Sequence, residues 1–125
     1  MNLTIRITGE IPPKKNSRIF NTKTRRCFPN KRYIEWHDIA AMEIMSQLPK
    51  DFKTVEKPVG LIVDLYHGDN KVRDDDNQLN SILDILKDIK IIRDDRWQYV
   101  PSKIIKNTLD RNNARCEITI YTIEE

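Results

Sequence analysis

The chain has 125 residues, which is the length of one ordinary domain, and a third of its residues are charged. No apolar run approaches the roughly 20 residues of a membrane-spanning helix, so the composition argues against a membrane protein. We therefore expect one domain over residues 1–125, with neither a signal peptide nor a linker. Cys27 and Cys116 lie far apart without metal-ligand spacing, and we expect free thiols in a cytoplasmic protein.

The net charge is only +3, but the charges are distributed unevenly along the chain. The segment 12–33 contains no acidic residue, and its basic residues are Lys14, Lys15, Arg18, Lys23, Arg25, Arg26, Lys31 and Arg32. The acidic residues gather instead at 74–76, at 94–95 and at the C-terminal end. A basic segment and an acidic cluster on one small domain suggest a polyanion that is held near a metal ion.

The hydrophobic pattern predicts the order strand, loop, helix, strand, helix, strand, strand. Leu3, Ile5 and Ile7 alternate with polar residues, as in a half-buried strand. The basic segment that follows is predicted to be a loop that could contain a short hairpin. The other elements are expected at 31–48 (helix), 59–68 (strand), 76–90 (helix), 99–109 (strand) and 116–123 (strand). This order is typical of a mixed α/β fold with two main helices packed on a mixed sheet.

Each predicted helix has an apolar stripe that should face the sheet. In the first helix the apolar positions are Ile34, Ala41, Met45 and Leu48, with Trp36 and Ile44 nearby. In the second it consists of Leu79, Ile82, Leu83 and Leu86. The opposite, polar face of the second helix carries Asp76, Asn80, Asp84 and Lys87. His37 and His67 have no second metal ligand at a useful spacing, so structural or surface roles are expected for them.

Three adjacent aspartates, Asp74, Asp75 and Asp76, lie at the start of the second predicted helix. Asp76 is placed to cap that helix, where a negative charge is favourable to the helix dipole. In an extended approach to the helix, Asp74 and Asp76 point the same way and Asp75 points the other way. Two carboxylates that share a space repel each other unless a cation lies between them. Mg²⁺ fits, because it takes oxygen ligands, often one or two carboxylates, and keeps several waters.

A second acidic pair, Asp94–Asp95, follows the helix. If the chain returns antiparallel to the helix, Asp95 can approach the helix start and join Asp74 and Asp76 around the metal. The other interpretation is a plain turn before Arg96. A hydrated Mg²⁺ on these carboxylates can activate a water and neutralise charge on a phosphodiester, while the basic segment holds the backbone by charge. Together these features favour nuclease chemistry.

Residues 72–86 (VRDDDNQLNSILDIL) and 91–97 (IIRDDRW) resemble the RusA family of Holliday junction resolvases, small Mg²⁺-dependent endodeoxyribonucleases of bacteria and prophages. The family pattern is a basic residue, then Asp-x-Asp-Asn, then a later Asp, and it is matched by Arg73, Asp74, Asp76, Asn77 and Asp84. The pair at 94–95 and the opening IPPKKNSR at 11–18 also match. The similarity therefore spans most of the chain.

The resemblance implies a homodimer whose two sites nick a four-way DNA junction symmetrically, in recombination and repair, inside a bacterial or phage-infected cell. It implies catalytic, metal-binding carboxylates at Asp74, Asp76 and Asp95, with Asp94 as an additional neighbour. The implied cofactor is Mg²⁺, with Mn²⁺ as an alternative. Phosphate contacts are expected from Arg73 and from the basic residues of segment 12–33, and supporting roles are expected for Asn77, Asn80 and Asp84.

One position departs from the family pattern. The family has a lysine that is important to its catalysis where this chain has Asn80. Asparagine can orient a water or a phosphate, but it supplies no positive charge, and Lys87 lies about 10 Å further along the helix. A protein that recognises junctions without cutting them is therefore an alternative. A metal-dependent hydrolase of small phosphorylated substrates is a further one, which the long basic segment disfavours.

Overall fold

The computed structural model describes residues 1–13, 18–21, 26–29 and 31–123, with 18–21 and 26–29 as backbone only. Its elements in chain order are β1 (Asn2–Thr8), β2 (Arg18–Asn21), β3 (Arg26–Pro29), α1 (Lys31–Gln47), β4 (Val59–His67), α2 (Asp75–Asp88), β5 (Ser102–Leu109) and β6 (Arg115–Thr122). Within this described part of the chain, neither helix has the length and apolar character that crossing a bilayer requires.

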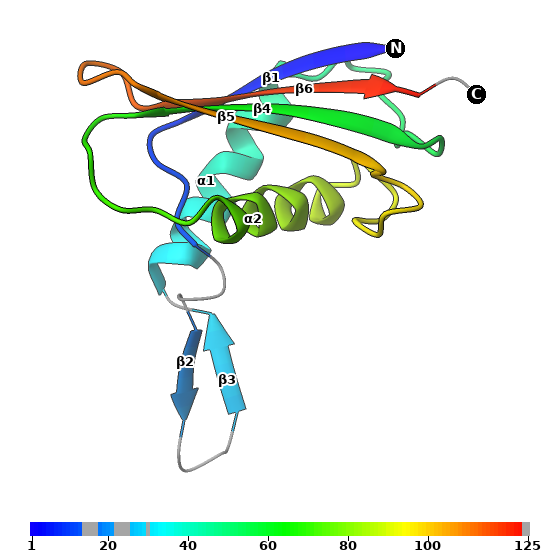
Figure 1. The fold of residues 1–125 in the computed structure, drawn as a ribbon. Helices are drawn as coiled ribbons and strands as arrows, with labels where there is room; N and C mark the ends of the chain where they lie inside the picture. The colour runs from blue at the N-terminus through cyan, green and yellow to red at the C-terminus, as the bar shows by residue number, and fades with distance from the viewer. Residues whose placement is uncertain (14–17, 22–25, 30, 124–125) are drawn as a thin grey trace.

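Four strands form one mixed sheet, and the two helices lie on one side of it (Figure 1). The strand order is β1-β6-β4-β5, in which β6 pairs antiparallel with β1 and β4, whereas β5 runs parallel to β4. Because parallel neighbours need a crossover connection, α2 joins β4 to β5. β2 and β3 form a separate hairpin that projects away from the sheet. The predicted mixed fold with two main helices is confirmed, and the basic segment does contain a hairpin.

The core lies between the sheet and the helices. Alternate residues of three strands face it and are at most 2% exposed: Ile5, Ile7, Leu61, Val63, Leu65, Ile118 and Ile120. The apolar residues that α2 buries against them are Ile82, Leu83, Ile85 and Leu86. The predicted stripe of this helix is therefore confirmed, except that Leu79 is only partly buried. With its apolar face fixed on the sheet, α2 turns its polar face outward.

The predicted apolar positions of α1 are confirmed only in part, since Ala41 and Leu48 pack against the core but two others do not. Two members of the expected stripe, Ile34 and Met45, are 44% and 60% exposed. The fully buried residues of α1 are Tyr33, Ala40 and Ile44, of which only Ile44 was among the predicted apolar positions.

The edge of β1 explains this difference. The side chain of Gln47 accepts a hydrogen bond from the N–H of Arg6 at 2.8 Å and donates one to the carbonyl of Arg6 at 2.7 Å. One helical turn earlier, the carboxylate of Glu43 accepts hydrogen bonds from the N–H and the hydroxyl of Thr8. These polar side chains pair with the backbone of an edge strand, so the face of α1 that meets the sheet is not a simple apolar stripe.

Cys116 is a free thiol in the core of β6, as the prediction of unpaired cysteines requires. Burial, together with the nearby carboxylates of Asp64 and Glu117, raises the pKa of this thiol well above its ordinary value. The thiol therefore stays protonated and acts as a small apolar side chain. Cys27 belongs to β3, whose side chains lie outside the described part of the structure.

Gly60 of β4 leaves room for the ring of Tyr121, its partner across the β4–β6 pair. A Cβ atom at residue 60 would lie 2.1 Å from Cζ of that ring. We expect Gly60→Ala to lower the free energy of unfolding, measured in urea, by about 1–3 kcal/mol, the usual cost of overpacking. In a Tyr121→Ala background the same substitution should cost much less. An equal cost with and without the ring would contradict this explanation.

Candidate metal and nucleic-acid site

The first turn of α2 is organised by Asp74, the N-cap residue. Its backbone is extended, and its Oδ1 accepts a hydrogen bond from the N–H of Asp76 at 2.9 Å. The prediction that Asp76 caps the helix is therefore wrong, because Asp74 supplies the acceptor and the helix begins at Asp75. The other oxygen of Asp74, Oδ2, has no hydrogen-bond partner among the described residues.

The next two aspartates have different surroundings. Asp75 accepts hydrogen bonds from the side-chain amide of Asn107 in β5, at 3.0 Å and 3.2 Å. Asp76 is exposed, and within the described ranges no donor or cation reaches its carboxylate. Capping explains Asp74 and the contact with Asn107 explains Asp75, but no contact with a described residue explains the carboxylate of Asp76.

Arg73 orders the loop 68–74 between β4 and α2. Its guanidinium lies 2.8 Å from Oδ1 of Asp69 and 3.3 Å from Oε1 of Glu10. It also donates to the carbonyls of Asp69 and Lys71 at 3.4 Å and 3.2 Å. The N–H of Lys71 and the charge of Arg73 hold the pKa of the Asp69 carboxyl below its ordinary value. Arg73 thus ties the loop before the aspartates to Glu10, and its contact with a DNA phosphate stays a prediction.

Two cavities flank this loop. A cavity of about 370 Å³ is lined by Asp74, Asn77 and Arg32, together with the turn at 10–13. A second cavity, of about 360 Å³, is lined by His67, Asp75 and Asn107, among others. Lys71 and Arg73 line both cavities. Cations and the N-terminus of α2 therefore surround the aspartates, an arrangement that can receive a phosphate group.

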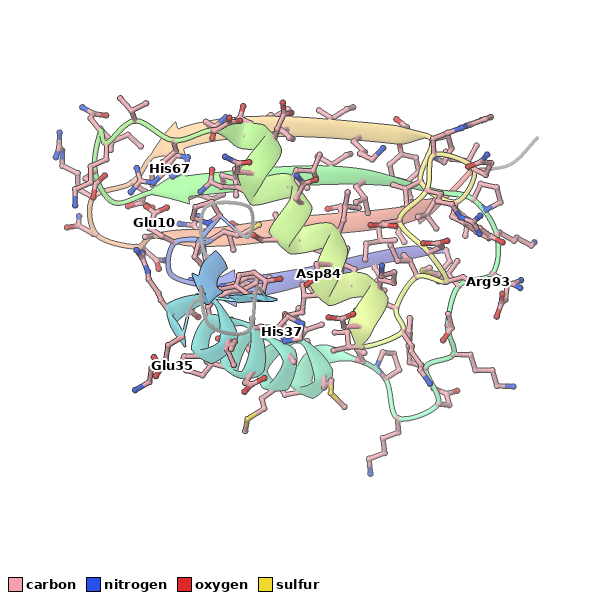
Figure 2. The ribbon with its side chains drawn as sticks, turned by 90° about the horizontal axis from the view of Figure 1, so that it is seen from below. Glu10, Glu35, His37, His67, Asp84 and Arg93 are labelled. Atoms are coloured by element: carbon pink, nitrogen blue, oxygen red, sulfur yellow. The ribbon has the colours of Figure 1, made fainter. Side chains whose placement is uncertain are left out.

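The second acidic pair, Asp94–Asp95, lies at the other end of α2. Oδ1 of Asp95 is 4.0 Å from Nζ of Lys87, which belongs to the last turn of the helix. The 14 residues of α2 separate its two ends by about 20 Å. Figure 2 shows the same separation, with Arg93 at one end of the molecule and His67 at the other.

Within one chain, therefore, Asp95 does not approach Asp74 and Asp76. The return strand β5 does run back along the sheet, but it begins only at residue 102, after the acidic pair has been passed. Asp94 accepts hydrogen bonds from the N–H of Asp95 and from Arg96, and these two donors hold the pKa of its carboxyl below the ordinary value. Asp95 is the less constrained carboxylate of the pair.

A separate group of metal-binding side chains lies between α1 and α2. One ligand atom each from His37, Asp84 and Asp88 lies within 4.8 Å of the others. Figure 2 labels His37 and Asp84 of this group. Nε2 of His37 is 2.9 Å from Oδ2 of Asp88, and the hydroxyl of Tyr33 donates to Asp84. A nitrogen and two carboxylates suit Zn²⁺ or Mn²⁺ better than Mg²⁺. The i, i+4 spacing of Asp84 and Asp88 in α2 was the one available sequence signal for this group.

The local geometry combines exposed aspartates at a helix N-terminus with cations around a polar hollow. A sequence profile described as Endodeoxyribonuclease RusA matches residues 9–121, nearly the whole chain. The chain belongs to the RusA family. RusA proteins are metal-dependent nucleases that resolve Holliday junctions, so the family acts on branched DNA. A comparison with curated proteins found no match.

Some of the basic residues predicted to bind DNA in this RusA protein can be located. Lys31 is exposed on α1, 3.7 Å from Glu35, and Arg32 lines the cavity beside Asp74. Arg18 and Arg26 belong to the hairpin, for which only the backbone is described. The other predicted contacts fall on residues outside the described ranges: Lys14, Lys15, Lys23 and Arg25. All these DNA contacts stay predictions.

The position of the RusA lysine is exposed here but uncharged. Asn80 lies on the polar face of α2, and in the part of the chain that is described no lysine contacts Asp74 or Asp76. Of the predicted supporting residues, Asn77 lines the cavity beside Asp74, whereas Asp84 belongs to the group near His37.

Three residues that order the RusA site had no sequence signal. Glu10 follows β1, His67 ends β4 and Asn107 lies in β5, and the sequence gives no motif that joins them. Only the alignment of the strands brings the three side chains together beside the loop 68–74.

Proposed function

We propose that this protein is a Mg²⁺-dependent, homodimeric endonuclease that resolves four-way DNA junctions by paired, symmetric nicks in the cytoplasm of a bacterial or phage-infected cell. The match to the RusA family over residues 9–121 carries the proposal. It is supported by Asp76, a carboxylate that the fold exposes and leaves without a partner among the described residues.

Asp74 and Asp76 are the residues that would hold the ion. Oδ2 of Asp74 and the carboxylate of Asp76 are both free of described partners, and Mg²⁺ commonly binds one or two carboxylates together with waters and substrate phosphates. When bound, the ion would activate a water and neutralise charge on the phosphodiester. The group at His37 offers a nitrogen ligand, which Mg²⁺ does not favour, so we assign Mg²⁺ to the aspartates.

A homodimer would supply the third carboxylate, Asp95. In one chain Asp95 lies beside Lys87, at the far end of α2 from Asp74 and Asp76, and cannot share their ion. A two-fold axis that passes beside the middle of α2 turns this helix antiparallel to its copy. That arrangement brings the first turn of each helix to the last turn of the other, and it repeats the site twice. Two equivalent sites suit a reaction that needs two cuts on strands of like polarity.

The residues of the chain would act on the DNA by position and charge. Arg32 and Lys71 face the cavity beside Asp74, where they can contact a phosphate. The N-terminus of α2 adds a positive end to the same place. The hairpin segment contributes further cations by sequence, so binding should weaken steeply with salt.

The deciding experiment compares a mobile synthetic four-way junction with a linear duplex of the same sequence, each with Mg²⁺ and with EDTA. We expect paired nicks on the junction that require Mg²⁺, and no cutting of the duplex. If the protein cuts the junction and the linear duplex to the same extent, the assignment is refuted.

Asn80 favours a second candidate, a protein that binds junctions without cutting them, because this residue is uncharged where the family has its lysine. In the same experiment this candidate would bind the junction tightly and leave both strands intact at every Mg²⁺ concentration.

A further inference from the structure

The imidazole of His67 has an oxygen atom at each of its ring nitrogens. Nδ1 is 3.0 Å from Oε2 of Glu10, and Nε2 is 2.7 Å from Oδ1 of Asn107. The side chain is only 12% exposed, so water competes little for either nitrogen. Figure 2 shows Glu10 and His67 near each other at one end of the sheet.

Both oxygens are acceptors. Glu10 is a carboxylate, and its other oxygen faces the guanidinium of Arg73. The amide nitrogen of Asn107 donates to both oxygens of Asp75, which leaves Oδ1 for His67. If the side-chain amide of Asn107 were flipped by 180°, its Oδ1 would face the Asp75 carboxylate, and two hydrogen-bond acceptors would then lie against each other.

A neutral imidazole donates from one ring nitrogen, whereas an imidazolium donates from both. We infer that protonated His67 is a positioning residue, a cationic clamp that joins Glu10 to Asn107 and so fixes the first turn of α2. This inference rests on the proposed function, because that turn carries the aspartates assigned to the metal ion.

Charged groups reach the clamp from every segment around it. Glu10 comes from the turn after β1, Arg73 and Asp69 come from the loop, and Asp75 comes from α2, while β5 offers the uncharged Asn107. Loss of the proton from the imidazole converts one hydrogen bond into a contact between two acceptors. Either Glu10 or Asn107 must then move away, and each of them holds the site: Glu10 holds the loop, and Asn107 holds Asp75.

The test is a Mn²⁺ titration of the full chain between about pH 6 and 8.5, the range in which an imidazole titrates. A His37→Gln background leaves His67 as the one imidazole and removes the nitrogen ligand of the other metal-binding group. We expect Mn²⁺ affinity to fall about tenfold or more as His67 loses its proton, which ¹⁵N NMR of the ring follows. The fall is distinctive, because carboxylate sites ordinarily gain or keep metal affinity as pH rises.

Two variants separate the clamp from a general effect of pH. In Glu10→Gln the new amide can donate to Nδ1 of a neutral imidazole while its oxygen keeps the N–H of Gly68, so the alkaline fall should disappear. His67→Gln should bind Mn²⁺ weakly at every pH. Asp51→Asn removes an exposed carboxylate elsewhere and should keep the fall. Urea unfolding at each pH checks that the variants are folded.

A fall that persists in Glu10→Gln, or one that does not follow the titration of His67, would overturn the clamp, as would absence of Mn²⁺ binding at every pH. Asp76→Asn in the same background should abolish the signal and so assign it to this site. Failure of the proposed function is distinguishable, because it would leave Mn²⁺ binding and its pH dependence intact in a protein that does not cut junctions.

Discussion

The Asp76→Asn protein is expected to bind a four-way junction as tightly as the wild type or more tightly, and to cut it about a thousandfold more slowly. The loss of rate corresponds to about 4 kcal/mol of transition-state stabilisation by a metal that has lost one ligand. Binding survives because the carboxylate of Asp76 has no partner among the described residues, and removal of its charge lessens repulsion of the DNA phosphates. Single-turnover cleavage and gel-shift titration measure the two effects.

Asp51→Asn is the matched control, since it removes one exposed carboxylate from the connection between α1 and β4. Its cleavage rate should equal that of the wild type. Loss of junction binding by a folded Asp76→Asn protein would contradict the assignment of this residue, because it would indicate a structural rather than a metal-binding role.

Two variants that are each inactive as homodimers should regain junction cleavage when one chain of each forms a mixed dimer. If each site takes Asp76 from one chain and Asp95 from the other, a dimer of Asp76→Asn with Asp95→Asn contains one intact site and one doubly damaged site. Co-expression with two affinity tags isolates this dimer. We expect it to nick junctions at about half the wild-type rate and to leave mostly single nicks, because only one of two equivalent sites works.

The mixed dimer of Asp74→Asn with Asp76→Asn is the control, because both of its sites are damaged under any arrangement and it should stay inactive. If Asp76→Asn with Asp95→Asn also stays inactive although it binds junctions, the shared site is refuted. The third carboxylate would then have to come from the same chain through a large rearrangement of the connection after α2.

The sequence predicted α2 well and α1 poorly, and the cause is the surface that each helix meets. α2 lies on the apolar face of the sheet, so Ile82 and Leu86 follow the helical period. α1 meets the edge of β1 with Glu43 and Gln47, whose contacts with backbone groups leave no apolar signal. The position of the N-cap differed by two residues because either Asp74 or Asp76 can supply the acceptor.

The sequence indicated the proposed metal ligands but neither the residues that order their loop nor the place of Asp95 in the fold. Adjacent carboxylates at Asp74 and Asp76 are visible in the sequence because they repel each other without a cation. The location of Asp95 depends on where the chain turns after α2, which no local pattern specifies. The contacts of His67 depend on the pairing of β4 with β5, so its two acceptors could not be foreseen.

The parallel pairing of β4 and β5 has a consequence for unwanted cleavage of cellular DNA by single chains. The helix must carry the chain along the whole sheet before β5 can start, so a lone chain always keeps its two groups of aspartates apart. In the proposed arrangement an isolated chain that meets DNA is harmless. The cleavage rate then rises with the square of protein concentration at high dilution, because only the dimer cuts. Monomers leave the genome intact.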